Sequence, residues 1–116
     1  MATILRIGGG TADLTKIYSV NIAPNSSDAK VRYTADADYD SLLIVHALMN
    51  DSTHGNSNIM DGSATNGTLT LLANQYYEYG ASRLTHNVYR WDNVKSGDTF
   101  TATSWWAGNM TVLKIV

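Results

Sequence analysis

The sequence predicts an all-β protein, folded as an antiparallel β-sandwich or barrel of roughly eight to ten short strands. Runs rich in β-branched and aromatic residues recur along the chain, separated by turn signals at intervals of roughly 8–12 residues. Glu, Lys and Arg are scarce beside Thr, Ser, Asn and Tyr, and no run with helical periodicity exceeds a turn or two. With 116 residues, the chain fits one domain over 1–116.

Charge and cysteine content exclude several classes of protein. The net charge is −2 and charged residues make up 16% of the chain, so we expect no nucleic-acid partner. The absence of cysteine excludes disulfides and thiolate metal sites. No signal peptide is visible, and no apolar run approaches the ~18 residues of a membrane span. We therefore expect no membrane insertion.

The first third of the chain predicts three strands. Ala2–Ile7 is the first, and Gly8–Gly10 follows as a hinge or a loop with positive φ, so residues 1–12 form a strand plus a glycine-rich hinge. Thr15–Ile22 alternates, and Lys30–Ala35 alternates as a half-buried strand. The residues expected to share one face are Lys16, Tyr18, Val20 and Ile22 in the second strand, and Val31, Tyr33 and Ala35 in the third.

Three aspartates at alternate positions, Asp36, Asp38 and Asp40, follow the third strand. Carboxylates at this spacing suit calcium, but the glycine and the closing glutamate of an EF-hand loop are missing. The pattern favours a turn with solvated carboxylates, and we expect no cofactor. The next run, Ser41–Met49, is the most apolar of the chain and predicts a central strand covered on both faces, with His46 packed and hydrogen-bonded inside it.

The longest polar stretch, Asn50–Asn66, predicts a loop with a short edge strand at Asn58–Met60. Its Asp51, His54 and Asp61 match no metal-ligand spacing, so a surface loop is favoured over a metal site. Partner contact by this loop stays open as an alternative. Three further strands are expected at Gly67–Ala73, Gln75–Tyr79 and Leu84–Trp91.

The C-terminal segment predicts a hairpin: Thr99–Trp105, a turn at Ala107–Asn109, and Met110–Val116. The last strand is apolar on both faces, and such a strand must be covered on both. In so small a protein the second cover is another strand layer or another subunit. We expect the outward face to be an oligomer interface formed by Met110, Val112 and Val116, with Thr111, Leu113 and Ile115 on the opposite face.

Three segments, Tyr33–Val45, Lys95–Thr101 and Met110–Ile115, resemble the opening, penultimate and final strands of tumour-necrosis-factor-like trimeric jelly rolls of phage and prophage virion proteins. The resemblance covers the chain from about Val31 onward. It implies a jelly-roll-like sandwich that forms a homotrimer and acts as a fibre head, tail tip or capsid decoration. It also implies other virion proteins as partners, and a location in the virion or, before assembly, in the cytoplasm.

A carbohydrate-binding module or lectin is the alternative, because flat aromatic rings stack on sugar faces. Trp105 and Trp106 are adjacent, so in a strand one of them must point away from the core. The expected site for a cell-surface glycan comprises Trp105, Trp106, Trp91 and Tyr79, with polar contacts from Asp51, His54 and Asn56.

An enzyme is the third class to consider. No nucleophile elbow, zinc motif or phosphate loop is present, and Glu78 is the only glutamate that could serve a paired-carboxylate mechanism. We therefore predict a non-enzymatic protein without catalytic or metal-binding residues.

Overall fold

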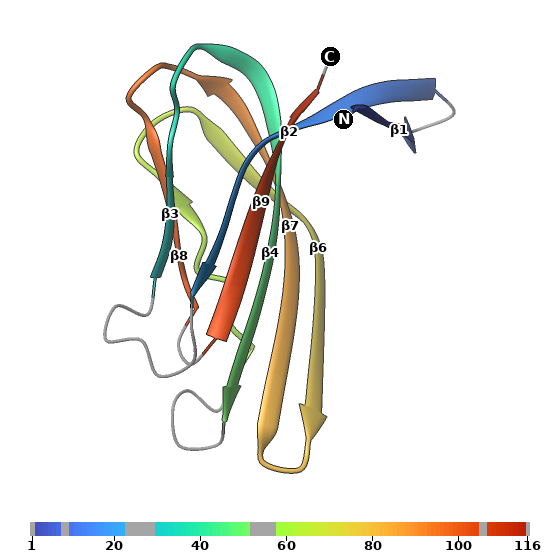
Figure 1. The fold of residues 1–116 in the computed structure, drawn as a ribbon, viewed down its shortest axis with the longest axis vertical. Helices are drawn as coiled ribbons and strands as arrows, with labels where there is room; N and C mark the ends of the chain where they lie inside the picture. Colours follow the sequence, from blue (N-terminus) through green and yellow to red (C-terminus); the bar gives the residue numbers. More distant parts are fainter. Residues whose placement is uncertain (1, 8–9, 23–29, 52–57, 105–106, 116) are drawn as a thin grey trace.

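The structure is a computed structural model that describes residues 2–7, 10–22, 30–51, 58–104 and 107–115. Within these residues it contains nine β-strands and no helix (Figure 1). The strands are β1 (Ala2–Ile7), β2 (Gly10–Ile22), β3 (Lys30–Thr34), β4 (Tyr39–Asp51), β5 (Ser63–Ala64), β6 (Thr68–Tyr79), β7 (Ser82–Val94), β8 (Thr99–Thr103) and β9 (Ala107–Ile115). The all-β prediction is confirmed.

The strands form two antiparallel sheets packed as a sandwich. The larger has six strands in the order β1-β2-β9-β4-β7-β6, and the smaller has three in the order β3-β8-β5. The partners are nested along the chain: β2 pairs with β9, β3 with β8 and β4 with β7, while β5 contacts β6. A long hairpin folded over itself in this way is a jelly roll. The predicted jelly-roll-like sandwich is therefore confirmed.

The hydrophobic core lies between the two sheets. Its largest fully buried side chains are those of Trp91 and Phe100, whose ring centroids are 6.5 Å apart. Leu42 and Ile44 of β4 and Val31 of β3 are also fully buried in it. The predicted alternation of β3 is confirmed, because Val31, Tyr33 and Ala35 are at most 5% exposed while the residues between them are exposed.

The predicted central strand is β4, which lies between β9 and β7. His46 is fully buried within it, and its Nε2 lies 3.1 Å from Ser104 Oγ, as expected for a packed histidine. A tight turn leads into β8. Gly97 has φ +93°, and the Lys95 N–H donates to the Asp98 carboxylate at 3.0 Å.

The predicted C-terminal hairpin is wrong. β8 lies in the small sheet and β9 in the large one, so the chain crosses between the sheets after Thr103. Ala107, Gly108 and Asn109 belong to β9 and form no turn. Gly108 serves close packing, because a Cβ there would lie 2.6 Å from Ser104 Cβ and 3.0 Å from the Ala47 carbonyl oxygen. A glycine in a strand often marks such an approach.

Three other sequence-based predictions differ from the structure. Two of these differences come from register shifts in β2 and β6, and the third concerns the position of β5. A register shift between Lys16 and Tyr18 places Lys16 opposite Leu113 and Tyr18 opposite Val112, hence on different faces of β2. A second shift, between Leu71 and Ala73, lets the two strands predicted over residues 67–79 continue as β6. The predicted edge strand at 58–60 is not a strand, and the short strand in this region is β5.

Candidate functional site

The most distinctive surface of the molecule is the side of the large sheet that faces away from the small one. We call it the outer face. The strand registers arrange it in four rows across β9, β4, β7 and β6. The rows are Leu113, Leu43, Arg90 and Thr70; Thr111, Val45, Val88 and Ala73; Asn109, Ala47, His86 and Gln75; and Ala107, Met49, Leu84 and Tyr77.

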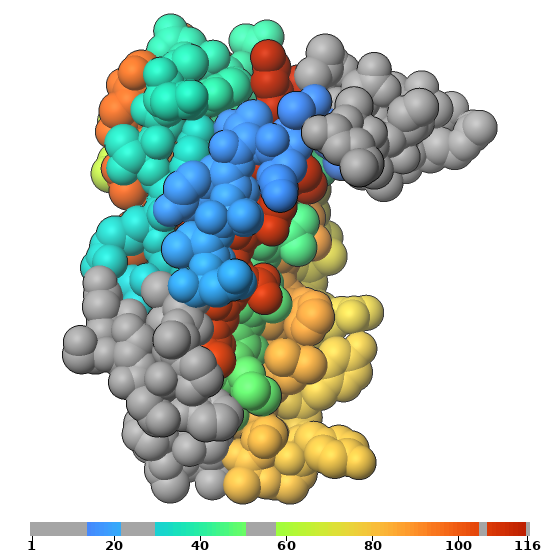
Figure 2. Space-filling view, in the orientation of Figure 1, coloured from blue at the N-terminus to red at the C-terminus, as the bar shows by residue number. Residues whose placement is uncertain are grey.

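The outer face is apolar along β4 and partly open. Val45, at its centre, is 38% exposed, and Tyr77 near its lower end is 52% exposed. Arg90 is the one formally charged residue in the four rows, and its Nε lies 2.9 Å from Asp92 Oδ1. Side chains of β9, β4, β7 and β6 follow one another on the visible surface from red through green and orange to yellow (Figure 2). A surface of this composition is typical of a contact with another protein.

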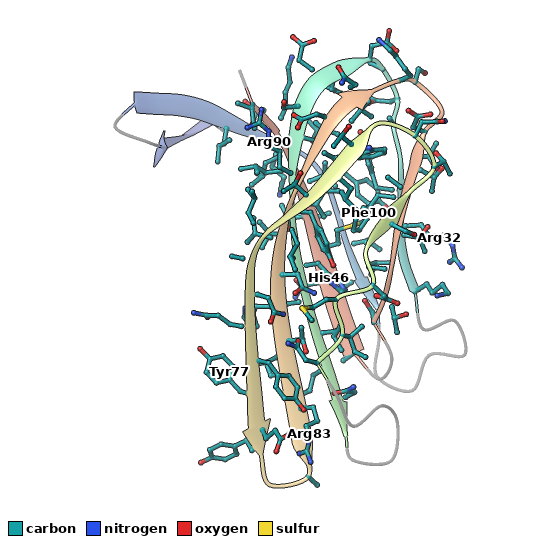
Figure 3. All side chains as sticks on the ribbon, turned by 180° about the vertical axis from the view of Figure 1, so that it is seen from behind. Arg32, His46, Tyr77, Arg83, Arg90 and Phe100 are labelled. Carbon is teal, nitrogen blue, oxygen red and sulfur yellow. The ribbon has the colours of Figure 1, made fainter. Side chains whose placement is uncertain are left out.

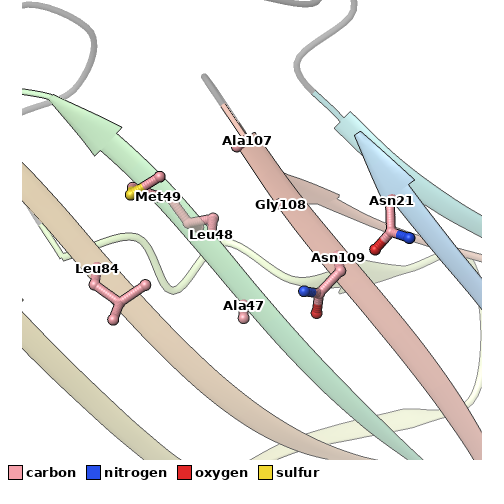
Figure 4. Close-up of a pocket in the computed structure, with 8 residues that line it drawn as sticks. All are labelled: Asn21, Ala47, Leu48, Met49, Leu84, Ala107, Gly108 and Asn109. Atoms are coloured by element: carbon pink, nitrogen blue, oxygen red, sulfur yellow. The ribbon is translucent and has the colours of Figure 1, made fainter. Parts of the chain in front are cut away.

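A shallow hollow of about 280 Å³ lies at the lower end of the outer face (Figure 4). Small residues of β4 and β9 create it, since Ala47, Ala107 and Gly108 leave room between longer neighbours. Asn21 and Asn109 face each other across β2 and β9 at one side. The lining residues are Asn21, Ala47, Leu48, Met49, Leu84, Ala107, Gly108 and Asn109. The hollow could receive a side chain with an apolar body and a polar tip that hydrogen-bonds to the amide of Asn21 or Asn109.

The structure corrects the predicted oligomer interface. Met110 and Val112 are fully buried in the core between the sheets, so a second copy cannot reach them. Thr111, Leu113 and Ile115 form the outward side of β9 and are half-buried. Val116 lies outside the described residues. The sequence thus predicted correctly which residues of β9 share a face. It assigned the set with Met110 and Val112 to the surface, whereas this set faces the core.

The residues predicted for ligand binding separate in the structure. Trp91 is fully buried, and its indole N–H donates to the Asn66 carbonyl at 2.8 Å, so it cannot stack on a ligand. Tyr79 is 86% exposed at the end of β6. Ser82 of β7 pairs with Tyr79 of β6 on one side and with Asp51 of β4 on the other. The Asp51 backbone therefore lies at the same end of the sheet as Tyr79, with β7 between them. Trp105, Trp106, His54 and Asn56 lie outside the described residues.

Tyr77 was not predicted as a site residue, although it belongs to the same outward alternation as Tyr79. Figure 3 shows its ring pointing away from the body of the protein, on the side from which the β1–β2 hairpin also projects. Its hydroxyl donates to Gln75 Oε1 at 3.1 Å, so the ring is held along the strand. Tyr77 and Tyr79 therefore offer two neighbouring exposed rings on one strand.

A buried polar group joins β4 to the end of β8. His46 contacts Ser104 as described, and the Asp61 carboxylate accepts hydrogen bonds from the Thr103 N–H at 3.1 Å and from its hydroxyl. Burial lowers the pKa of His46 to about 4, against the opposing effect of the negative charge of Asp61. His46 and Ser104 are both fully buried, so a substrate cannot approach the Ser104 hydroxyl. The arrangement stabilises the fold by joining its two layers.

The three aspartates considered for calcium have separate roles in the structure. Asp36 accepts a hydrogen bond from the Tyr39 hydroxyl at 2.6 Å, and this bond holds the pKa of its carboxyl below the usual value. Asp38 accepts from the Ser96 N–H at 2.9 Å, and Asp40 is exposed. No group of three His, Cys, Asp or Glu in the described ranges is placed to hold a metal ion.

Comparison of the chain with protein-family models, curated proteins and solved structures found no match. In the described part of the chain, no helix is long and apolar enough to cross a membrane.

Proposed function

We propose that this chain is a non-enzymatic structural protein of a phage-type virion, a self-assembling trimeric jelly roll that acts as a fibre head, tail tip or capsid decoration. The observation that carries the proposal is the open apolar outer face. The nested strand pairing supports it further, because it is the fold that the resemblance to trimeric virion jelly rolls implies.

The physical argument concerns β4 and β9, the two central strands of the large sheet. Their inward residues are largely buried in the core, and the outward residues of β4 are apolar too, with Leu43 buried but Val45, Ala47 and Met49 partly accessible. Antiparallel sheets usually present polar residues on a solvated face. An outward face of Leu, Val, Met and Ala therefore fits an interface that resembles a core cut in half, as in obligate oligomers.

Substitution at the centre of this face tests the assembly. Val45→Asp places a charge in the proposed contact, and removing a charge from water without a partner costs several kcal/mol. We expect size-exclusion chromatography to show the wild type as an oligomer and Val45→Asp as a folded 12.6-kDa monomer. Thr34→Asp, an exposed strand position of the small sheet, is the matched control and should leave the oligomer unchanged.

The virion assignment has its own test. Peptides of this chain are expected, by mass spectrometry, in virus-like particles purified from cells that carry its gene. Particles that lack the chain would contradict the assignment, whatever the outcome of the assembly test.

We propose carbohydrate binding as a second candidate function, favoured by the exposed rings of Tyr77 and Tyr79. A glycan array probed with the wild type, Tyr79→Ser and Leu72→Ser would test it. Leu72 is 53% exposed on the same strand. Leu72→Ser is the control, because it also removes exposed apolar surface but leaves the aromatic rings in place. Glycan binding that Tyr79→Ser removes and Leu72→Ser keeps is the expected result. A wild type that binds no glycan would contradict this function.

A further inference from the structure

The N-terminal hairpin is an arm that extends from the body of the protein. We define the arm as β1 together with residues 10–13 of β2. Figure 1 shows it projecting to one side at the end of the molecule where β9 also ends. Among the described residues, β2 is the only element with which β1 makes extensive contact. The arm is thus held by one strand pairing, from Ala2 opposite Thr15 to Ile7 opposite Gly10.

An isolated two-stranded hairpin is only marginally stable in water. The sequence of β1, ATILRI, contains four apolar residues in six, which is unusual for a strand with no layer packed on it. Stability of the arm therefore requires a second surface. Among the described residues, no element other than β2 supplies such a surface.

The arm is continuous with the outer face. Residues directly opposite each other in an antiparallel pair share a face of the sheet. Thr3 lies opposite Leu14, which in turn lies opposite Ile115 of β9. Leu5 and Ile7 follow Thr3 at alternate positions, so by register they belong to the side that joins the outward side of β9. Beyond this point the β1–β2 hairpin diverges from the body of the large sheet (Figure 1).

We propose that the arm of one copy of this chain packs on the outer face of a second copy. This inference rests on the self-assembly proposed above and adds to it the segment that each copy contributes. It accounts for both surfaces together, since within the described residues Val45 and Tyr77 of the outer face stay exposed and β1 makes extensive contact with β2 alone.

The size of the combined surface fits this arrangement. One position on a sheet face occupies roughly 33 Å², from the strand separation and twice the rise per residue. The four rows of the outer face then span roughly 500 Å², and one side of the arm roughly 200 Å² more. A standard interface buries about 800 Å² on each partner. The outer face and the arm together approach this value, whereas the outer face alone falls short of it.

The charge of the outer face also favours a second copy over a charged partner. Its charges lie at the border of the four rows, where Arg90 is paired with Asp92 and Lys16 of β2 lies opposite Leu113. Residues at the centre of an interface between like subunits are typically uncharged, and a strongly charged partner would find no counterpart here. By register, β1 contributes the uncharged Thr3, Leu5 and Ile7 to the side of the arm that joins the outer face, and Arg6 belongs to the other side.

Cysteine cross-linking tests the inference directly, because the wild-type chain has no cysteine. One full-length variant carries Leu5→Cys in the arm, and a second carries Val45→Cys on the outer face. The two are mixed, allowed to exchange subunits, and treated with a short bismaleimide. We expect a covalent pair containing one chain of each variant. Thr34→Cys, on the exposed side of the small sheet, replaces Val45→Cys as the matched control and should give at least tenfold less product.

The outcomes separate this inference from the proposed assembly. An oligomeric wild type without a cross-link from Leu5→Cys to Val45→Cys, or to Ala47→Cys as a second position, would overturn the role of the arm and leave self-assembly standing. A chain carrying both Leu5→Cys and Val45→Cys, diluted with excess wild type, should give no cross-link within itself. An internal cross-link would show that the arm covers its own outer face and would also overturn the inference. A monomeric wild type would overturn both proposals.

Discussion

The two faces of the large sheet differ far more in their surroundings than in their residues. On β4, Leu42 and Ile44 point into the core and are fully buried, while Val45, the next residue, is 38% exposed. On β9, Val112 is fully buried and Leu113 is only half-buried. All of these side chains are large and apolar. The comparison shows that β4 and β9 present large apolar residues on both faces of the sheet, whereas at Val45 and Leu113 the described chain covers the outer face only in part.

Replacing neighbouring residues of β9 by aspartate should give the largest difference between the faces. Val112→Asp introduces a charge into the core, where an unpaired charge costs several kcal/mol, so the chain should fail to fold. Leu113→Asp adds the same charge on the outer face and should give a folded monomer. Circular dichroism and sedimentation distinguish the two results. A folded Val112→Asp chain would contradict the placement of the core.

Stability should fall with acid because of His46 on the inner face. The folded pKa of about 4 lies below the ordinary value of 6.5, so the unfolded chain binds a proton at higher pH than the folded chain. This contribution is fully present above pH 6.5 and decreases as the pH falls toward 4, by up to about 3 kcal/mol. The free energy of unfolding, measured in urea at a series of pH values, gives the size of this contribution. The series stops at about pH 4.5, because most carboxylates protonate below that pH.

His46→Gln keeps a group that can hydrogen-bond to Ser104 but does not titrate, so it should flatten this pH dependence. His86→Gln is the control and is measured in the Val45→Asp chain, in which His86 stays exposed. Equal slopes for the wild type and His46→Gln would show that the buried histidine does not cause the acid sensitivity.

Gly108→Ala should destabilise the fold by about 1–3 kcal/mol, because the added Cβ would overlap Ser104 on the inner side of β9. The double variant Gly108→Ala with Ser104→Gly removes the overlapping side-chain atoms and should recover part of the loss. Denaturant midpoints measure both variants. If the double variant is less stable than the sum of the two single changes predicts, the overlap with Ser104 is not the cause.

Val45→Ala should have the smallest effect on the folding of a single chain, less than about 1 kcal/mol, because the side chain is partly solvated there. Ile44→Ala, one residue earlier, should cost about 2–5 kcal/mol. The assembled protein should respond differently, with Val45→Ala dissociating at a higher protein concentration than the wild type. Equal dissociation constants would remove Val45 from the interface.

Much of the fold follows from short-range patterns in the sequence. Alternation identified the inward residues of β3, and the unbroken apolar run identified β4 as central, because both signals depend on the side-chain period of a strand. Alternation also divided β9 into the correct two sets. It could not say which set faces the core, because both sets are apolar and the choice depends on the sheet to which β9 belongs.

The remaining errors have a common physical origin. Gly108 was interpreted as a turn residue, but it is required by the approach of Ser104, a contact that exists only after the chain has crossed between the sheets. Lys16 was assigned to the wrong face because an irregularity in one strand changes the alternation beyond it. Of the ligand residues, Trp91 was misplaced because an aromatic residue in a strand fits a core as well as a surface.

The central claim is that a second copy of the chain covers the outer face, and the mass of the unaltered protein in solution tests it most directly. Sedimentation velocity over a wide range of concentrations should give a species of three times 12.6 kDa that dissociates only on dilution. A single species of 12.6 kDa at every concentration would contradict the account, because the apolar face would then be exposed to water without a partner.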